Sequence, residues 1–520
     1  MTRFLGLRGN RLTIASILGV LMPGIMTVGY NTASLGGVLS LESFKKNFPE
    51  IDIAHADNKD HASTLEGALV ASYAIGTFIG TFCCIWLGDI LGRRRTMLAG
   101  AVIQLMGYAL NTSAYSFAQL FVSRLIVGIG TGALLATVPL WISETSPAKR
   151  RGSHVATKGI FSGLGCASAL FLEYGLSFKK HTSLSWRLPF GFPTVLSVML
   201  LLFVFFLPES PRWLIRKGRI AEARVVLAAL ADIDIDCEKI DNTINEVQTS
   251  LNLAGGDTSF KLLFQMGPQR TFHRAILAIG GLVFLQFTGA TVTTYYTTAI
   301  FESNLGLEQS TARLLAAVYQ LVGPLGATLC VFIIERAGRR RLMLGSAIGN
   351  TICLACIAGL GAQTDNIQAS HGAVFFLFLF HFCYIIGFGG IPYLYATEIA
   401  PLHLRSTINS VSISIGGAIS ILIAHITPIA FNAMGEYYFL IYAGLNAAMA
   451  PAIFILFPET SGRSLEEIDD IFTLSESAFS TVRVARRLPC FPSRQGIEGT
   501  SPTDEKPKMD TVFKEKEIPV

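Results

Sequence analysis

The sequence is poor in charge. Only 15% of its 520 residues are Asp, Glu, Lys or Arg, whereas 51% are apolar and the mean hydropathy is +0.50. About 25% of the residues of an average protein are charged. A soluble chain of this length would divide into roughly three domains, and 41 basic and 36 acidic residues cannot cover their surfaces. The composition excludes a disordered chain, a coiled coil and an ordinary soluble enzyme, and it favours lipid as the solvent.

Groups that would perform chemistry or hold a metal are also missing. The nine cysteines are odd in number, and most of them fall in apolar runs, where they serve as small packing residues. Cys353 and Cys356 form a CxxC pair, but no second pair completes a metal site. No nucleophile, metal or cofactor constellation is present, so we expect neither an enzyme nor a cofactor. The net charge of +5 is too small to indicate nucleic-acid binding.

Long runs without charge are abundant. A membrane-spanning helix needs about 20 consecutive apolar residues, and eleven stretches between consecutive charged residues reach that length. A twelfth run is apolar except for Lys158 and Glu173. In chain order the runs are 12–41, 67–88, 96–123, 125–143, 154–175, 188–208, 275–301, 314–334, 342–364, 366–397, 406–435 and 437–458. The sequence therefore predicts an all-α integral membrane protein with twelve transmembrane helices.

Basic clusters indicate the orientation of these helices. Residues 93–95, 149–151, 212–219 and 339–341 are rich in Lys and Arg, and each cluster follows an even-numbered run. Because positive charge is retained on the cytosolic side of a membrane, these loops and both termini are expected to be cytosolic. We expect a multi-pass protein of the plasma membrane.

Three charged motifs occur twice, roughly 250 residues apart. The paired copies begin at Asp89 and Glu335, at Glu144 and Glu398, and at Pro208 and Pro458. Three matches in the same order indicate a duplication into two parallel six-helix halves, an arrangement found in transporters that bind solute at the midplane. The predicted division is a first half (1–208), a cytosolic helical linker (209–270), a second half (271–458) and a partly disordered cytosolic tail (459–520).

Each half carries acids and arginines at its cytosolic helix ends. An arginine fork holds a carboxylate through two hydrogen bonds, so we predict one gating or structural network in each half. The members are Asp89, Arg93, Arg94, Glu144, Arg151, Glu209 and Arg212 in the first half, and Glu335, Arg339, Arg340, Glu398, Arg405, Glu459 and Arg463 in the second. A network that forms only when the cytosolic side is closed would bias alternating access. The alternative is that these charges set only the topology and the solubility.

Several motifs resemble those of the sugar-porter family of the major facilitator superfamily, in particular its fungal-like members. They are Arg124-x-x-x-Gly128-x-Gly130-x-Gly132, Pro139-Leu-Trp-Ile-Ser-Glu-Thr-Ser-Pro147, Trp186-Arg-x-Pro189, Pro208-Glu-Ser-Pro-Arg-Trp-Leu214, Glu335-Arg-Ala-Gly-Arg-Arg340 and Pro458-Glu-Thr-x-Gly-Arg-Ser-Leu-Glu-Glu-Ile468. The family's first loop motif usually opens with Gly, where this sequence has Ile85. The resemblance implies a carrier of a small polyol-like solute that rocks two bundles as a monomeric unit.

The resemblance also places the substrate contacts. The positions that keep a polar or aromatic residue are Asn31, Gln286, Thr291, Tyr295, Tyr296, Tyr393 and Ser420. The polar residues of hexose carriers are replaced at Gly159, Leu285, Gly323, Ile385, Gly416 and Gly417. An unmade buried hydrogen bond costs about 1–3 kcal/mol, so a wider and less polar site is implied, suited to a larger or less hydroxylated solute. The alternative is that other residues replace the lost groups and that the solute is still a sugar, such as a disaccharide.

Coupling to protons depends on position 31. Proton-coupled members of the family carry Asp at this place, where an arginine at the position of Arg124 can hold it. This sequence has Asn31, which cannot titrate, so we expect facilitated, uncoupled transport. Lys158 and Arg124 are candidate charges of the cavity, and the alternative for Lys158 is that it snorkels to the interface. Glu173 lies near the outer end of its run and is expected to reach water.

Four functions remain open at this point. The first is a facilitator of a sugar or sugar-like solute, and the second is a carrier recruited to another solute, such as a secreted metabolite. The third is a proton-coupled sugar symporter. A non-transporting nutrient sensor is the least favoured, because sensors of the family typically have much longer cytosolic tails.

Overall fold

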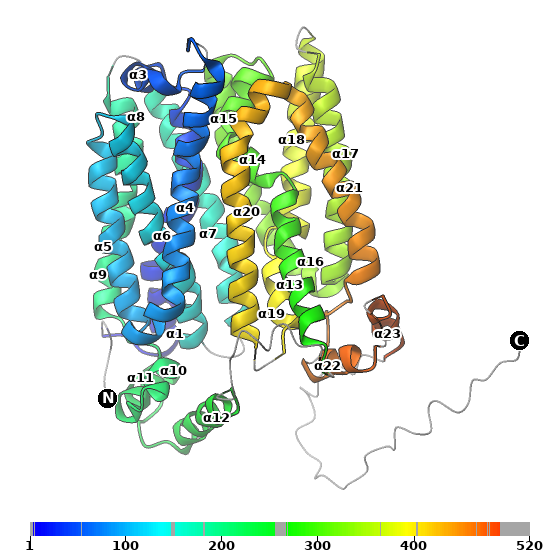
Figure 1. Cartoon of the computed structure of the whole chain (residues 1–520). Coiled ribbons are helices and arrows are strands. Elements are labelled where there is room, and N and C mark those ends of the chain that lie inside the picture. The colour runs from blue at the N-terminus through cyan, green and yellow to red at the C-terminus, as the bar shows by residue number, and fades with distance from the viewer. Residues whose placement is uncertain are drawn as a thin grey trace, which may run out of the picture.

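In the computed structural model of the chain, long helices stand side by side in a bundle (Figure 1). The structure describes residues 4, 6–53, 55–146, 151–179, 182–254, 267, 269–363, 366–401, 404–463, 465–475, 477 and 479–488. Across these residues the chain forms helices joined by turns and loops, apart from an isolated β-bridge between Phe4 and Leu7. The predicted all-α architecture is confirmed.

Two sets of helices build the bundle. The first half comprises α1 (Gly9–Ser16), η1 (Ile17–Leu21), α2 (Met22–Val38), α3 (Glu42–Asn47), η2 (Pro49–Ile51), α4 (Lys59–Leu91), α5 (Arg93–Thr112), α6 (Phe117–Thr145), α7 (Arg151–Ser177), α8 (Leu184–Gly191) and α9 (Pro193–Phe206). The second half comprises α13 (Thr271–Phe287), α14 (Ala290–Tyr295), α15 (Thr297–Ala299), η5 (Ile300–Asn304), α16 (Gln309–Ala337), α17 (Arg339–Gly361), α18 (Ile367–Gly387), α19 (Ile391–Ile399), α20 (Arg405–Met434), η6 (Gly435–Tyr437) and α21 (Tyr438–Leu456). We call the end of the bundle that carries Arg93 and Arg339 the inner end, and the opposite end the outer end.

Nine stretches of the described residues are long and apolar enough to cross a membrane. One of them, Thr407–Leu456, covers most of α20 and all of α21. The helix α5 and the run from α13 to α15 complete the twelve crossings. The chain is therefore a multi-pass membrane protein, as its apolar runs predict.

Three of the crossings are interrupted. The helix α8 gives way to α9 at Phe192, just before Pro193. The helix α13 stops before Gly289, whose φ of +90° is one that L side chains rarely adopt. Between α18 and α19, residues 388–390 leave the helix. Charge-free runs do not reveal these breaks, because the sequence is equally apolar on both sides of each.

The buried apolar residues divide differently at the two ends of the bundle. The largest cluster joins both halves, and it includes Tyr30 and Leu69 of the first half with Tyr295 and Tyr319 of the second. Towards the inner end, one cluster is built from the first half and the linker, and a separate one from the second half and the tail. Packing contacts therefore join the halves on the outer side, whereas on the inner side each half packs on itself.

Short helices cover the inner end (Figure 1). The helices α10 (Pro211–Arg216), α11 (Ile220–Ala231) and α12 (Glu238–Ala254) lie beneath the first half and share an apolar cluster of their own. The helices α22 (Leu465–Thr473) and α23 (Thr481–Arg487) lie beneath the second half. On α22, Phe472 packs against His273 and Arg274 at the start of α13.

Candidate functional site

A charge cluster closes the inner end of the first half. Arg93, the first residue of α5, donates from Nε and Nη2 to the two carboxylate oxygens of Glu144, at 3.2 and 3.3 Å. Its Nη1 donates to Asp89 Oδ1 at 3.3 Å. The Arg93 and Glu144 side chains are only 12% and 6% exposed. The predicted bidentate pairing is therefore present, and it ties α4, α5 and α6 together.

The second half repeats this cluster. Arg339 donates to both carboxylate oxygens of Glu335 and to Glu398 Oε1, each at 2.9 Å. The remaining oxygen of Glu398 accepts from Thr460 at 2.6 Å. The repeated motifs of the sequence thus correspond to two charge clusters of the same layout, each confined to its own half.

Glu209 and Glu459 serve these clusters as helix caps. Glu209 accepts from the backbone N–H groups of Arg93 and Arg94 at 3.0–3.2 Å. Glu459 accepts from those of Arg339 and Arg340 at 2.8 and 3.1 Å. A carboxylate at a helix N-terminus satisfies free N–H donors and the helix dipole. Burial raises the pKa of the Glu209 carboxyl, while these backbone donors oppose the shift.

Not every predicted network residue joins the clusters. Arg212 is exposed on α10, and Arg216, one helical turn later, pairs with Asp89 at 2.9 Å. The side chain of Arg151 lies outside the described part of the structure. Arg212 and Arg216 lie on the same side of α10, one turn apart, and Arg216 is the one that reaches Asp89. The sequence motif does not show which of the two arginines makes this contact.

The tail accounts for the other differences. Arg463 donates to the carbonyl oxygens of Ala485 and Leu488 at the end of α23. Arg405 has no hydrogen-bond partner for Nε or Nη2 among the described residues. The buried Arg274, not predicted as a site residue, pairs with Asp469 of α22 and donates to the Ile399 carbonyl. The first turns of the tail are therefore part of the inner end of the second half.

Gly338 is essential to the second cap. Its φ is +86°, and an added Cβ would lie 2.5 Å from Glu459 Oε2. Left-handed backbone costs an L residue roughly 1–2 kcal/mol, and a lost cap costs about 1 kcal/mol more. We expect Gly338→Ala to lower the free energy of unfolding by about 2–3 kcal/mol, measured as thermal unfolding of the detergent-solubilised protein.

Gly345→Ala is the matched control for this prediction. Gly345 lies within α17, and an added Cβ meets nothing within 4 Å. Alanine is the better helix former, so this variant should match or exceed the native stability. Equal stability of the two variants would contradict the assigned role of Gly338.

Glycines bring the two halves into close contact on the outer side. A Cβ added at Gly36 of α2 would lie 2.2 Å from the backbone oxygen of Tyr295, which ends α14. A Cβ added at Gly67 of α4 would lie 2.2 Å from the backbone oxygen of His425 on α20. Real Cβ atoms do not approach so closely, so only glycine permits these contacts. The outer side of the bundle is closed by backbone contact between halves.

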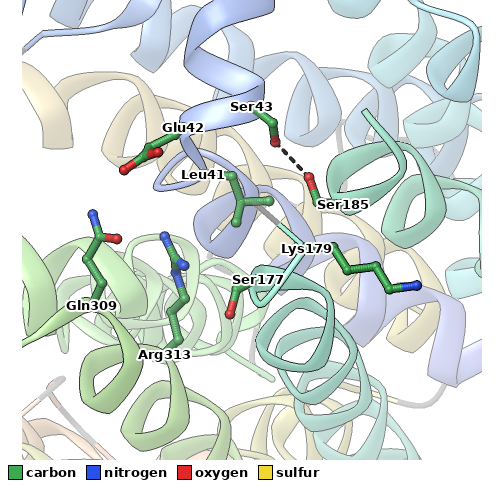
Figure 2. A pocket seen from close by; sticks show the side chains of 8 residues that line it. All are labelled: Leu41, Glu42, Ser43, Ser177, Lys179, Ser185, Gln309 and Arg313. Atoms are coloured by element: carbon green, nitrogen blue, oxygen red, sulfur yellow. Dashed lines mark hydrogen bonds between the residues drawn. The ribbon is translucent and has the colours of Figure 1, made fainter. Parts of the chain in front are cut away.

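Polar contacts reinforce the closed outer end. Arg313 of α16 donates to the backbone and side-chain oxygens of Ser40, at 2.9 and 3.2 Å. Asn432 of α20 donates to Asp60 Oδ1 at 3.0 Å. Figure 2 shows the small pocket beside Arg313, where side chains of both halves meet. Its lining is Leu41, Glu42, Ser43, Ser177, Lys179, Ser185, Gln309 and Arg313. We call the contacts of Gly36, Gly67, Arg313 and Asn432 with the opposite half the outer gate. The pocket lies beside Arg313, and none of the predicted substrate residues lines it.

Part of the predicted substrate set lies together on the second half. Gln286 accepts a hydrogen bond from Thr291 at 2.8 Å across the break at Gly289. A Cβ added at Gly416 of α20 would be 3.9 Å from Gln286 Nε2. Ser420 lies one turn further along α20, and α14, which ends at Tyr295, packs against α20. The break in the seventh crossing therefore brings Gln286, Thr291 and Tyr295 against α20.

Other predicted residues hold the fold or face the opposite half. Tyr296 donates to the Ala424 carbonyl at 2.8 Å and is buried. Asn31 donates to the Tyr108 hydroxyl at 2.7 Å within the first half. The ammonium of Lys158 lies 5.3 Å from the ring centre of Tyr393, across the interface of the halves. Lys158 therefore points to the second half.

The prediction that Glu173 reaches water is wrong. Its side chain is 2% exposed, and its Oε2 fills the space beside Gly37 on α2. The position of Glu173 near the outer end of α7 suggested exposure, but α2 covers this side of α7. Arg124 is also 2% exposed and lies 5.4 Å from the ring centre of Tyr73.

His381 is a further buried polar group in the second half. It is buried on α18, its ring lies 4.4 Å from that of Tyr319, and its Nε2 lies 3.4 Å from where a Cβ of Gly323 would be. Gly323 is the position at which the resemblance expects an asparagine. The imidazole of His381 thus lies beside Gly323, where the asparagine amide of hexose carriers is missing. This proximity can be seen only in the folded chain.

Comparison with known proteins identifies the family. A family model described as sugar (and other) transporter matches residues 16–472. The chain belongs to this family. Sugar transporter STL1 of Saccharomyces cerevisiae is 32% identical over 498 residues, covering 93% of this chain and 85% of that protein. MFS-type transporter oryC of Aspergillus oryzae is 33% identical over 451 residues, covering 85% and 82%.

A solved structure shares the fold. The xylose transporter XylE from E. coli, in a partially occluded inward open conformation, superposes with a TM-score of 0.72 at 18% identity. The match covers 88% of this chain and all of that chain. The protein is thus a membrane transporter with the major facilitator fold, as the repeated halves predict.

Proposed function

We propose that this sugar transporter family member carries a sugar or sugar-like small solute across the plasma membrane by alternating access, as a monomer with both termini in the cytosol. The observation that supports it most is the division of the core, which joins the halves on the outer side and separates them on the inner side. Such an arrangement suits two bodies, 1–208 and 271–458, that rock about a midplane site. The segment 209–270 is proposed as the linker between them.

The polar groups of the proposed binding site suit a solute with few hydroxyl groups. The hydroxyl of Thr291 already donates to Gln286 Oε1, and an added Cβ at Gly159 or Gly416 meets its nearest atoms only at 3.5 Å. Each unpaired hydroxyl of a bound sugar would cost about 1–3 kcal/mol. A recruited carrier of a less hydroxylated metabolite is therefore kept as a second candidate, in line with a relative named only as an MFS-type transporter.

Asn31 and Glu173 bear on whether transport is coupled to protons. The sequence favours uniport because Asn31 cannot titrate, and in the structure its amide donates to Tyr108. Glu173 favours proton-coupled symport instead, because its carboxyl group is buried within a membrane-spanning helix. The buried carboxyl of Glu173 is the observation that supports symport as the proposed mode.

Uptake by whole cells tests this proposal. The full chain is expressed in a transporter-null host, and uptake of labelled glucose, xylose, maltose and lactose is measured with external pH and an uncoupler varied. We expect uptake of at least one sugar, and we expect the uncoupler to abolish its accumulation. Uptake that is insensitive to the uncoupler would support uniport. No uptake of any sugar by protein at the cell surface would contradict the sugar assignment and favour the recruited carrier.

A further inference from the structure

A buried carboxyl group on α7 has no partner. Glu173 is 2% exposed, and neither carboxylate oxygen has a hydrogen-bond partner among the described residues. An ionised carboxylate in such a place is costly, whereas a neutral carboxyl group is tolerated. Acidic groups within membrane segments mark functional sites by default. Glu173 therefore needs an explanation that packing does not supply.

A buried cation near this carboxyl is also incompletely paired. Arg124 of α6 is 2% exposed, and its Nε and Nη2 lack hydrogen-bond partners in the described part of the chain. The ring of Tyr73 covers its guanidinium group. The helix of Glu173, α7, packs against α6, which carries Arg124, and against α16, which carries Arg313. The charges of both arginines act on the carboxyl group of Glu173. A carboxyl and a guanidinium group that lack hydrogen bonds here can pair when a helix shifts.

The position of Glu173 connects it to the outer gate. Its Oε2 lies 1.7 Å from where a Cβ of Gly37 would be, so the carboxyl group packs directly on α2. The preceding residue, Gly36, contacts the backbone oxygen of Tyr295 in the second half. One turn along the chain, Ser40 accepts hydrogen bonds from Arg313. A change in the charge of Glu173 thus acts on the segment of α2 that closes the outer side.

We propose that Glu173 is the proton-binding group of this carrier, and that Arg124 is its counter-charge when the proton leaves. The neutral acid fits the closed outer side described here. Loss of the proton creates a carboxylate that is stable only beside a cation, which favours a shift of α7 towards Arg124 and loosens the packing on α2. The proton leaves to the inner side, and a new proton from the outer side binds the same carboxylate in the next cycle, so no other reactant is needed. The inference rests on the proposed function as a solute carrier.

Liposomes that contain the purified full chain provide the test. Labelled xylose and glucose are used in two assays, counterflow without a pH gradient and accumulation driven by an inward proton gradient. A gradient of about two pH units can drive about a hundredfold accumulation with one proton per solute. We expect Glu173→Gln to keep counterflow within about twofold of the native rate and to lose the gradient-driven accumulation, because the amide cannot titrate. Glu308→Gln, at an exposed position near the outer end, is the control and should behave as the native protein.

Each outcome decides the proposal. Gradient-driven accumulation by Glu173→Gln would overturn it, and so would native protein that exchanges solute but never accumulates it. If the native protein exchanges neither sugar, the sugar assignment fails for these probes, and infrared difference spectra between acidic and alkaline pH test the proton site alone. A titrating carboxyl band that is present in the native protein and absent from Glu173→Gln supports the site. The same band in both proteins would overturn it.

Discussion

Replacing Gly36 with leucine is expected to abolish transport while the protein stays folded. The added side chain would meet the backbone oxygen of Tyr295, where even a Cβ comes within 2.2 Å. Overpacking of this kind costs roughly 1–3 kcal/mol or more. Here it destabilises only the conformation in which the outer gate is closed. The halves can avoid it by staying apart on the outer side. A loss of about 2.7 kcal/mol corresponds to transport about a hundredfold slower.

The control for this prediction is Gly175→Leu. Gly175 lies on α7 near the outer end, and an added Cβ meets nothing within 4 Å. Transport by this variant should equal that of the native protein, and both variants should elute as single species from gel filtration. In Gly36→Leu, a cysteine introduced at Thr291 should react faster with an impermeant thiol reagent from outside. Native transport rates in Gly36→Leu would mean that the outer contact is not part of the cycle.

Arg93→Ala is expected to produce the largest loss of stability at the inner end. Arg93 holds both oxygens of Glu144, and the two side chains are almost fully buried. Removing one partner leaves an uncompensated buried charge, which costs about 3–5 kcal/mol. The contact to Asp89 adds little, because that carboxylate is 41% exposed. Thermal unfolding of the solubilised protein and the yield of folded protein measure the effect.

A double variant separates the ion pair from the backbone. In Arg93→Ala with Glu144→Gln the stranded charge is gone, so part of the lost stability should return. Arg95→Ala removes an exposed arginine from the same helix turn and should change stability by less than about 0.5 kcal/mol. If Arg93→Ala is no less stable than Arg95→Ala, the cluster serves topology alone.

The twelve crossings and the repeated halves could be predicted from the sequence because lipid imposes simple rules. A crossing needs about 20 apolar residues, and charges collect at its ends. The duplicated motifs group Arg93 with Glu144, and Arg339 with Glu398, in the two predicted networks. In the structure Arg93 pairs with Glu144, and Arg339 makes the corresponding pair with Glu398 in the second half.

The remaining features depend on contacts between segments far apart in the chain. Glu173 is buried because Gly37 leaves room for it on a neighbouring helix. Arg463 binds carbonyl groups of α23, a helix within a tail expected to be partly disordered. The break at Gly289, which places Tyr295 against the first half, lies in a run of uniform hydropathy. The order of residues along the chain does not show which distant segments become neighbours.

Distances between spin labels test alternating access most directly. One pair is placed at the outer end on the exposed residues Asp57 and Met434, and another at the inner end on Arg95 and Arg341, after replacement of the nine native cysteines. Alternating access predicts two populations, one with a short outer and a long inner distance and one with the reverse, and transported solute shifts the balance between them. Single, fixed distances at both ends in protein that still transports would contradict this mechanism.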